Sequence, residues 1–169
     1  MTKIRLGIIG HGFVGQATDG GFSKVKDKYI VDPKYGTSIN ELKNFKPNFI
    51  FICVPTPMKN DGSQDTSIVI DVFSKLKNNF QGVPKILKST ILPDTLVKLA
   101  NEHDSLIYNP EFLWEKNADE DFINAPVIIL GGKNTICKEV EKLYREYSVC
   151  KTDNYLFIDI KTASLIKYS

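Results

Sequence analysis

Three glycines and one aspartate near the amino terminus have the spacing of a nucleotide-binding loop. Gly10, Gly12 and Gly15 form G-x-G-x-x-G directly after one apolar run, and Asp32 ends the next. In this pattern the first glycine permits a tight turn, the second lets a diphosphate approach the backbone, and the third packs helix on strand. The aspartate can accept a hydrogen bond from a ribose hydroxyl and would repel a 2′-phosphate. Together these residues predict a dinucleotide site that favours NAD over NADP.

Other residues near this loop affect the prediction less. His11, Phe13 and Val14 lie between the glycines and would border the cofactor phosphates. A variable position of this pattern is usually exposed to solvent, so we assign no chemical role to His11. Lys34, close to Asp32, slightly weakens the preference against a 2′-phosphate. The alternative interpretation is a structural turn followed by a solvated aspartate.

Glu111 is a second candidate for chemistry, within the stretch YNPEFLWEKNADEDF at residues 108–122. It is followed by Phe112, Leu113 and Trp114, the only tryptophan in the chain. Apolar neighbours partly desolvate a carboxylate, and desolvation raises its pKa toward the range that is useful for a general base. The simpler interpretation places Phe112 and Leu113 in the core and makes Glu111 the cap of a short helix.

The elements that would position these residues alternate between apolar runs of strand length and segments of helical period. GIIG and FIFICV are apolar at consecutive positions, which is typical of parallel strands covered by helices on both faces. The order predicts an α/β fold of Rossmann type, with a doubly wound, mostly parallel sheet. We expect residues 1–169 to form one dinucleotide-binding domain, with a connecting helix starting at about residue 160.

Composition restricts the possible partners. The chain has 22 Lys and Arg against 20 Asp and Glu and no basic run, so nothing favours binding to nucleic acid. Its longest apolar run, residues 49–54, is too short to cross a bilayer, and the amino terminus lacks the features of a signal peptide. Cys53, Cys137 and Cys150 are scattered, as reduced thiols are. We expect a cytoplasmic protein without membrane or nucleic-acid partners.

Two further features have structural explanations. His103 follows a helical pattern without the Ser or Cys arrangement of a catalytic triad, so we expect it to close a helix. The acidic run at residues 119–121 could hold a divalent cation, but a solvated helix face is the simpler role. We therefore predict no metal site.

Three stretches follow the glycine loop in order: VPTPMKNDGSQDTS at 54–67, KSTILPDT at 88–95 and NPEFLWEKNADEDF at 109–122. Together with the loop they resemble the N-terminal domain of the UDP-glucose/GDP-mannose dehydrogenase family. The resemblance extends from Ile4 to Lys167, and its specificity lies in four motifs at compatible spacing. NPEFL is more similar to the glucose- and mannose-oxidising branches than to those acting on N-acetylated sugars.

The resemblance implies an NAD-dependent oxidation of a nucleotide sugar of the UDP-glucose or GDP-mannose type. The C6 alcohol would become an aldehyde, a cysteine adduct and finally a carboxylate, with two NAD reduced. Glu111 would activate the hydrolytic water, Thr90 would orient it, and Lys167 would match an active-site lysine. Residues implied at the cofactor are Gly10, His11, Gly12, Phe13, Val14, Gly15, Asp32, Val54, Pro55, Thr56, Pro57, Ser89, Thr90 and Glu115. Residues implied at the sugar are Glu111, Phe112, Leu113 and Lys167.

Some positions depart from the family pattern. Trp114 and Lys116 replace the Arg and Gly of FLREG, and Val127 replaces an Arg, so substrate choice and loop geometry need not follow the family. The family's long connecting helix, second α/β domain and nucleophilic cysteine have no counterpart here. We therefore expect no turnover by this chain alone, and a homodimer only in a complete enzyme. Alternatives are a free-standing NAD-binding or sensing module, or a dehydrogenase of 6-phosphogluconate or hydroxyacid type, against which NPEFL and VPTP argue.

Overall fold

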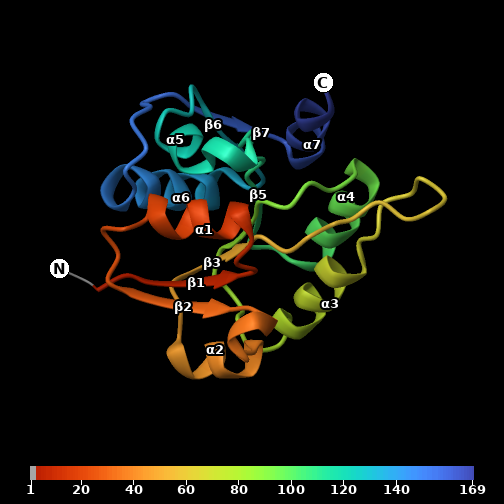
Figure 1. Ribbon diagram of the computed structural model, residues 1–169, viewed down its shortest axis with the longest axis horizontal. Coiled ribbons are helices and arrows are strands. Elements are labelled where there is room, and N and C mark those ends of the chain that lie inside the picture. The colour runs from red at the N-terminus through yellow and green to blue at the C-terminus, as the bar shows by residue number, and fades with distance from the viewer. Residues whose placement is uncertain (1–2) are drawn as a thin grey trace.

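The computed structural model describes residues 3–169 and has helices on both faces of a seven-stranded sheet (Figure 1). The strands are β1 (Arg5–Ile9), β2 (Asp27–Val31), β3 (Phe49–Ile52), β4 (Lys85–Leu87), β5 (Leu106–Tyr108), β6 (Ile128–Gly131) and β7 (Tyr155–Ile158). The helices are α1 (Phe13–Gly21), α2 (Ile39–Phe45), α3 (Ser67–Leu76), α4 (Pro93–Glu102), α5 (Ala118–Ile123), α6 (Asn134–Tyr147) and α7 (Ile160–Tyr168). Two short 3₁₀ turns are η1 (Pro33–Tyr35) and η2 (Glu115–Asn117).

The strand order β2-β1-β3-β4-β5-β6-β7 confirms the doubly wound, mostly parallel sheet. From β1 the chain moves to one side to form β2 and then crosses to the other side to form β3, so the winding direction changes between β1 and β3. Ligands of such sheets bind beyond the carboxyl ends of the strands at this switch. The sheet has one reversal of strand direction, whose position the sequence did not predict. β6 runs antiparallel to β5, and β7 runs parallel to β6.

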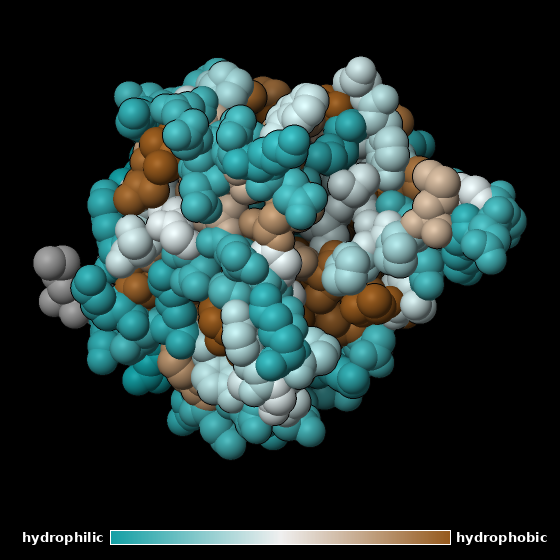
Figure 2. All heavy atoms as spheres, in the orientation of Figure 1, coloured by the Kyte–Doolittle hydropathy of each residue, from teal (hydrophilic) through white to brown (hydrophobic). Residues whose placement is uncertain are grey.

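Consecutive apolar residues are buried on opposite faces of the sheet, as GIIG and FIFICV predicted. In β3, Ile50 and Ile52 belong to a cluster that includes Phe73 of α3, whereas Phe51 belongs to a cluster with Tyr144 of α6. Burying one such side chain contributes about 1.5–3 kcal/mol. Two apolar layers therefore hold the same strands from both sides. The visible surface is mainly hydrophilic, with hydrophobic side chains in small groups (Figure 2).

The remaining local predictions mostly agree with the structure. His103 caps the carboxyl end of α4, and the acidic run at residues 119–121 lies in α5. Cys53 and Cys137 are buried free thiols, and Cys150 is a partly buried one. Helix α7 occupies the segment in which a helix was expected, packing beside α4 and β6. No helix within residues 3–169 has the length and apolar character needed to cross a membrane.

Candidate functional site

A cleft of about 460 Å³ lies at the carboxyl ends of β1, β3 and β4, beside the amino end of α1. It brings together segments that are far apart in the sequence. The predicted residues that line it are Gly10, His11, Gly12, Phe13, Val14, Asp32, Val54, Pro55, Thr56, Ser89, Thr90 and Glu111. The four motifs therefore meet around one hollow, at the edge where an open α/β sheet binds its ligand.

The three glycines have the separate roles that their spacing predicted. Gly10 has φ +91°, and a Cβ there would lie 2.6 Å from the carbonyl oxygen of Cys53. At Gly15 a Cβ would lie 2.1 Å from the carbonyl oxygen of Gly10, because the helix and the strand end touch there. At Gly12 a Cβ would meet no atom within 4 Å. The backbone of Gly12, which caps α1, is thus open to a ligand from the cleft.

Asp32 is fixed by backbone donors of the loops around it. Its carboxylate accepts hydrogen bonds from the amide N–H groups of His11, at 2.7 Å, and Lys34, at 3.0 Å. Burial raises the pKa of Asp32, but these two bonds and the nearby Lys34 charge outweigh it and hold the pKa below its usual value. Asp32 is thus a charged acceptor, and a carboxylate has about four acceptor positions, which leaves room for a ribose hydroxyl.

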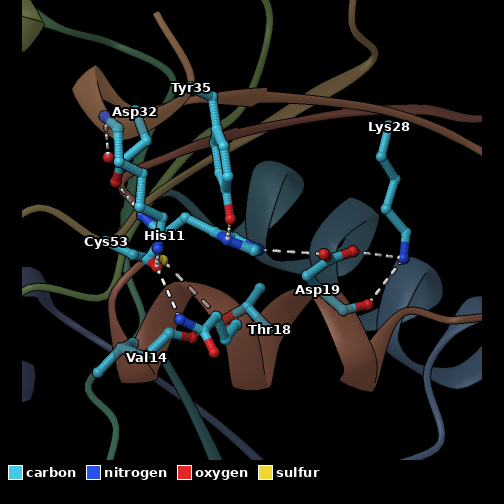
Figure 3. A network of polar contacts seen from close by, with 10 residues as sticks. His11, Val14, Thr18, Asp19, Lys28, Asp32, Tyr35 and Cys53 are labelled. Atoms are coloured by element: carbon cyan, nitrogen blue, oxygen red, sulfur yellow. Dashed lines mark hydrogen bonds and ion pairs between the residues drawn. The ribbon is translucent and has the colours of Figure 1, made fainter. Parts of the chain in front are cut away.

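The expectation that the His11 side chain is exposed to solvent is wrong. Only 12% of it is exposed, and its imidazole lies between two polar partners (Figure 3). Nδ1 lies 2.8 Å from the Tyr35 hydroxyl, and Nε2 lies 3.1 Å from Asp19 Oδ2. Asp19 also accepts from Lys28 Nζ at 2.8 Å. The network ties the glycine loop to α1 and η1, and no spacing rule in the sequence pointed to it.

Hydroxyl groups join the loops that follow β3 and β4. Ser89 Oγ donates to the carbonyl of Val54, and Thr56 Oγ1 donates to the carbonyl of Thr90, both at 2.7 Å. These bonds hold the two loops side by side as one wall of the cleft. Pro57 is not part of that wall; its carbonyl accepts from Asp65 N at 2.7 Å.

Glu111 lies at the far end of the cleft and forms an ion pair with Lys167. Lys167 Nζ is 3.2 Å from Glu111 Oε1 and also donates to the Glu111 carbonyl. Glu111 Oε2 accepts from Leu113 N at 2.6 Å. Glu111 therefore closes a local turn and caps no helix, which contradicts the simpler interpretation. As predicted, this carboxylate is partly desolvated, since only 9% of the Glu111 side chain is exposed. Its apolar neighbours Phe112 and Trp114 are themselves exposed by 52% and 77%.

Gly15 and Lys167 do not line this cleft, and two further groups of predicted residues line neighbouring hollows. Phe112 and Leu113 line a smaller pocket of about 220 Å³, which shares Glu111 and Lys88 with the cleft. Glu115 lines a separate groove between α1 and α5, which shares His11 and Phe13 with the cleft. The geometry thus puts the candidate sugar residues beside the cleft and leaves Glu115 on its outer side.

Lys88 is the main residue that sequence analysis missed, although it begins the KSTILPDT stretch. It is buried in the wall between the cleft and the smaller pocket. Its Nζ donates to Asn109 Oδ1 at 3.0 Å and to the Tyr144 hydroxyl at 3.4 Å. Burial lowers the pKa of Lys88. Lys88 directly follows the apolar run that forms β4 and directly precedes Ser89. Because a lysine is rarely buried without a partner, its place in the sequence was a usable signal of a polar contact near the cleft.

Comparison with known proteins identifies the family. The profile of the "UDP-glucose/GDP-mannose dehydrogenase family, NAD binding domain" matches residues 33–148. The UDP-glucose 6-dehydrogenase of Rickettsia bellii (strain RML369-C) is 35% identical over 138 residues, which is 76% of this chain and 31% of that protein. The chain thus spans less than a third of the length of this curated relative.

Solved structures agree in fold. The GDP-mannose dehydrogenase of Pseudomonas aeruginosa superposes with a TM-score of 0.76 at 22% identity, covering 98% of this chain and 48% of that one. A UDP-glucose dehydrogenase of Pyrobaculum islandicum gives 0.76 at 22% identity, covering 99% and 49%. The family profile covers more than half of the chain and includes the VPTP, KST and NPEFL stretches. This chain therefore belongs to the UDP-glucose/GDP-mannose dehydrogenase family and comprises its NAD-binding domain.

Proposed function

We propose that this chain is the cofactor-binding part of a cytoplasmic nucleotide-sugar 6-dehydrogenase. The complete enzyme would oxidise the C6 alcohol of UDP-glucose, or a similar nucleotide sugar, to the carboxylate with two NAD. One observation carries the proposal: the cleft joins the glycine loop and Asp32 at one end to Thr90 and Glu111 at the other. A binding module without chemistry would have no need of the partly buried Glu111–Lys167 pair.

The residues present fit NAD in a defined direction. The diphosphate would lie at Gly12 and the amino end of α1, and the adenosine ribose would lie at Asp32. The nicotinamide end would then reach Ser89 and Thr90. When bound there, NAD would supply the acceptor for the hydride that leaves the substrate.

Glu111, Thr90 and Lys167 would act on the sugar side of the same cleft. Lys167 Nζ holds the Glu111 side chain at 3.2 Å, and a carboxylate in this place can take a proton from water. Thr90 lines the cleft with Glu111, and its hydroxyl would orient that water. We propose that Phe112 and Leu113 contact the sugar, and that α7 continues into the family's connecting helix, second domain and dimer interface. The nucleophilic cysteine would belong to that second domain, because Cys53 is buried and burial raises its pKa to about 11.

The cofactor assignment is tested by titrating the isolated chain with NAD and NADP in a calorimeter. NAD should bind more tightly, and Asp32→Ala should weaken NAD binding about tenfold, since one charge-assisted hydrogen bond contributes about 1.5 kcal/mol or more. The same variant should narrow the difference between the two cofactors. Asp27→Ala is the control, because it removes the same charge at the opposite end of β2, away from the cleft. NADP binding as tight as NAD in the wild type would refute the role of Asp32.

A further inference from the structure

The opposite edge of the sheet contains a second polar cavity, of about 640 Å³. It lies at the amino ends of β4 and β5, whereas the cofactor cleft lies at their carboxyl ends. Its lining residues are Lys77, Asn78, Gln81, Gly82, Lys85, Glu102, His103, Asp104, Ser105, Lys133, Thr135 and Ile136. None of them belongs to the four motifs that define the cofactor cleft.

The reversal of β6 brings the amino end of α6 to this cavity. Because β6 runs antiparallel to β5, the chain leaves β6 at the amino edge of the sheet and enters α6 there. Lys133 is the amino-terminal cap of α6 and provides no side-chain hydrogen bond to it. Among the described residues, the amide N–H groups of Asn134 and Thr135 have no hydrogen-bond partner. Free N–H groups at a helix start favour an anion.

His103 is an independent sign of a ligand. The residue is only 6% exposed and packs its ring edge-on against Phe73, with centroids 4.9 Å apart. Within residues 3–169 its ring nitrogens have neither a hydrogen bond nor an ion pair, and His103 lines the cavity. The only fully enclosed side-chain polar atom without a partner in this part of the chain is the Tyr108 hydroxyl. The His103 nitrogens are therefore not fully enclosed, and a ligand in the cavity that His103 lines is a partner within reach of them.

The charges around the cavity favour an anion. The charged residues that line the cavity are Lys77, Lys85 and Lys133 against Glu102 and Asp104, and the charges that act on His103 itself are those of Lys85, Glu102 and Lys77. Lys77 pairs with Glu102 at 3.6 Å. Lys133 pairs with Asp104 at 3.1 Å, but both side chains are largely exposed, and exposed pairs contribute only about 0–1 kcal/mol. The Lys133 ammonium can therefore turn to a stronger acceptor. Lys85 stays fixed, since it donates to two carbonyls and to Ser105.

We propose that this cavity binds a phosphate group at the amino end of α6, with the Lys133 ammonium and the His103 imidazole as side-chain donors. The ligand class is a small phosphate dianion or phosphomonoester, because two free N–H groups and a cation match its oxygens. The site is separate from the cofactor cleft, so a phosphate compound could bind there while NAD occupies the other edge.

The two histidines of the chain allow a direct test, because His11 lies at the cofactor edge and His103 at the other. The imidazole signals of both are followed by NMR from pH 5.5 to 8.5, with inorganic phosphate or with sodium chloride at equal ionic strength. Burial, followed by the Lys85 charge, lowers the pKa of His103, and a bound dianion should raise its titration midpoint. NAD should shift the His11 signals and leave those of His103 in place.

Matched variants locate the site. Lys133→Met should weaken phosphate binding about tenfold, the loss of one charge-assisted hydrogen bond, whereas Lys142→Met in the same helix should not change it. In His103→Phe, which keeps the ring contact with Phe73, weakened binding is read from the amide signals of Asn134 and Thr135. Equal effects of phosphate and chloride on His103 would overturn the proposal. Unchanged phosphate affinity in Lys133→Met would do the same.

Discussion

Gly12 offers the sharpest test of the cofactor site, because a single methyl group there should affect the ligand and not the fold. Its φ of −74° lies outside the left-handed region that favours glycine, and the added Cβ would meet no atom within 4 Å. The space that the methyl would fill is the space assigned to the NAD diphosphate. Gly12→Ala therefore adds a group that only a bound cofactor can contact.

The expected magnitudes separate binding from stability. Exchanging a glycine cap for alanine should change the free energy of unfolding by about 1 kcal/mol or less. NAD binding should weaken about tenfold to hundredfold, because a displaced diphosphate loses one charge-assisted hydrogen bond or more, at about 1.5–3 kcal/mol each. Gly15→Ala is the opposite case. Its Cβ would lie 2.1 Å from the Gly10 carbonyl oxygen, so it should cost about 1–3 kcal/mol of stability before any ligand is added.

Urea unfolding and calorimetric titration with NAD measure the two quantities on the same samples. Gly20→Ala is the matched control, since its Cβ also meets nothing within 4 Å, and Gly20 lies in α1 away from the cleft. It should stabilise α1 and leave NAD affinity unchanged. If Gly12→Ala binds NAD as tightly as the wild type, no diphosphate approaches this backbone and the assignment of the glycine loop fails.

Three further predictions address the catalytic residue, a buried lysine and the fold. In an enzyme completed with the family's catalytic half, Glu111→Gln should slow thioester hydrolysis about a hundredfold or more, releasing a burst of NADH and leaving sugar on the cysteine; full turnover would contradict its role. The pKa of Lys85 is lowered by burial to about 8, so an unfolded chain holds this proton more strongly. The free energy of unfolding of the wild type, relative to that of Lys85→Met, should thus rise by about 2–3 kcal/mol between pH 8 and about 10. A difference between the two proteins that does not change with pH would show that folding does not lower the pKa of Lys85. Thermal unfolding of the isolated chain should be one cooperative transition, because both apolar clusters share the same strands; a broad melt would show otherwise.

The parts of the fold that the sequence predicted are those fixed by short-range patterns. The apolar runs, the glycine spacing and the helix end at His103 each follow from local backbone or burial requirements, and they predicted strands, loop and helices correctly. The direction of β6 was not predictable in this way. β6 pairs with β5 through Gly131 and Tyr108, and the connection between the two strands contains only η2 and α5. An apolar run in the sequence does not indicate in which direction its strand will run in the sheet.

Side-chain partners from distant segments were also not predictable. His11 sits within a recognised motif, but its contacts with Tyr35 and Asp19 depend on where η1 and α1 meet after folding. For Glu111 the exposure was predicted but the partner was missed. Adjacent apolar letters predicted a partly desolvated carboxylate, and only 9% of the side chain is exposed, but its partner is Lys167, 56 positions later in the chain. Neighbours in sequence indicate contact partners poorly where the backbone has neither helix nor strand period.

Two buried lysines at the ends of β4 explain how two very short strands, β4 and β5, keep a fixed position relative to each other beside the cleft. Lys85 starts β4 and Lys88 directly follows it, and each donates to a residue that borders β5: Lys85 to Ser105 and Lys88 to Asn109. Both strands have three residues, so their ladder alone offers few hydrogen bonds. The lysines add a tie at each end of this pair. Because Ser89 and Glu111 follow these strands closely, the tie at Lys88 fixes the distance between the cofactor wall and the carboxylate that faces it.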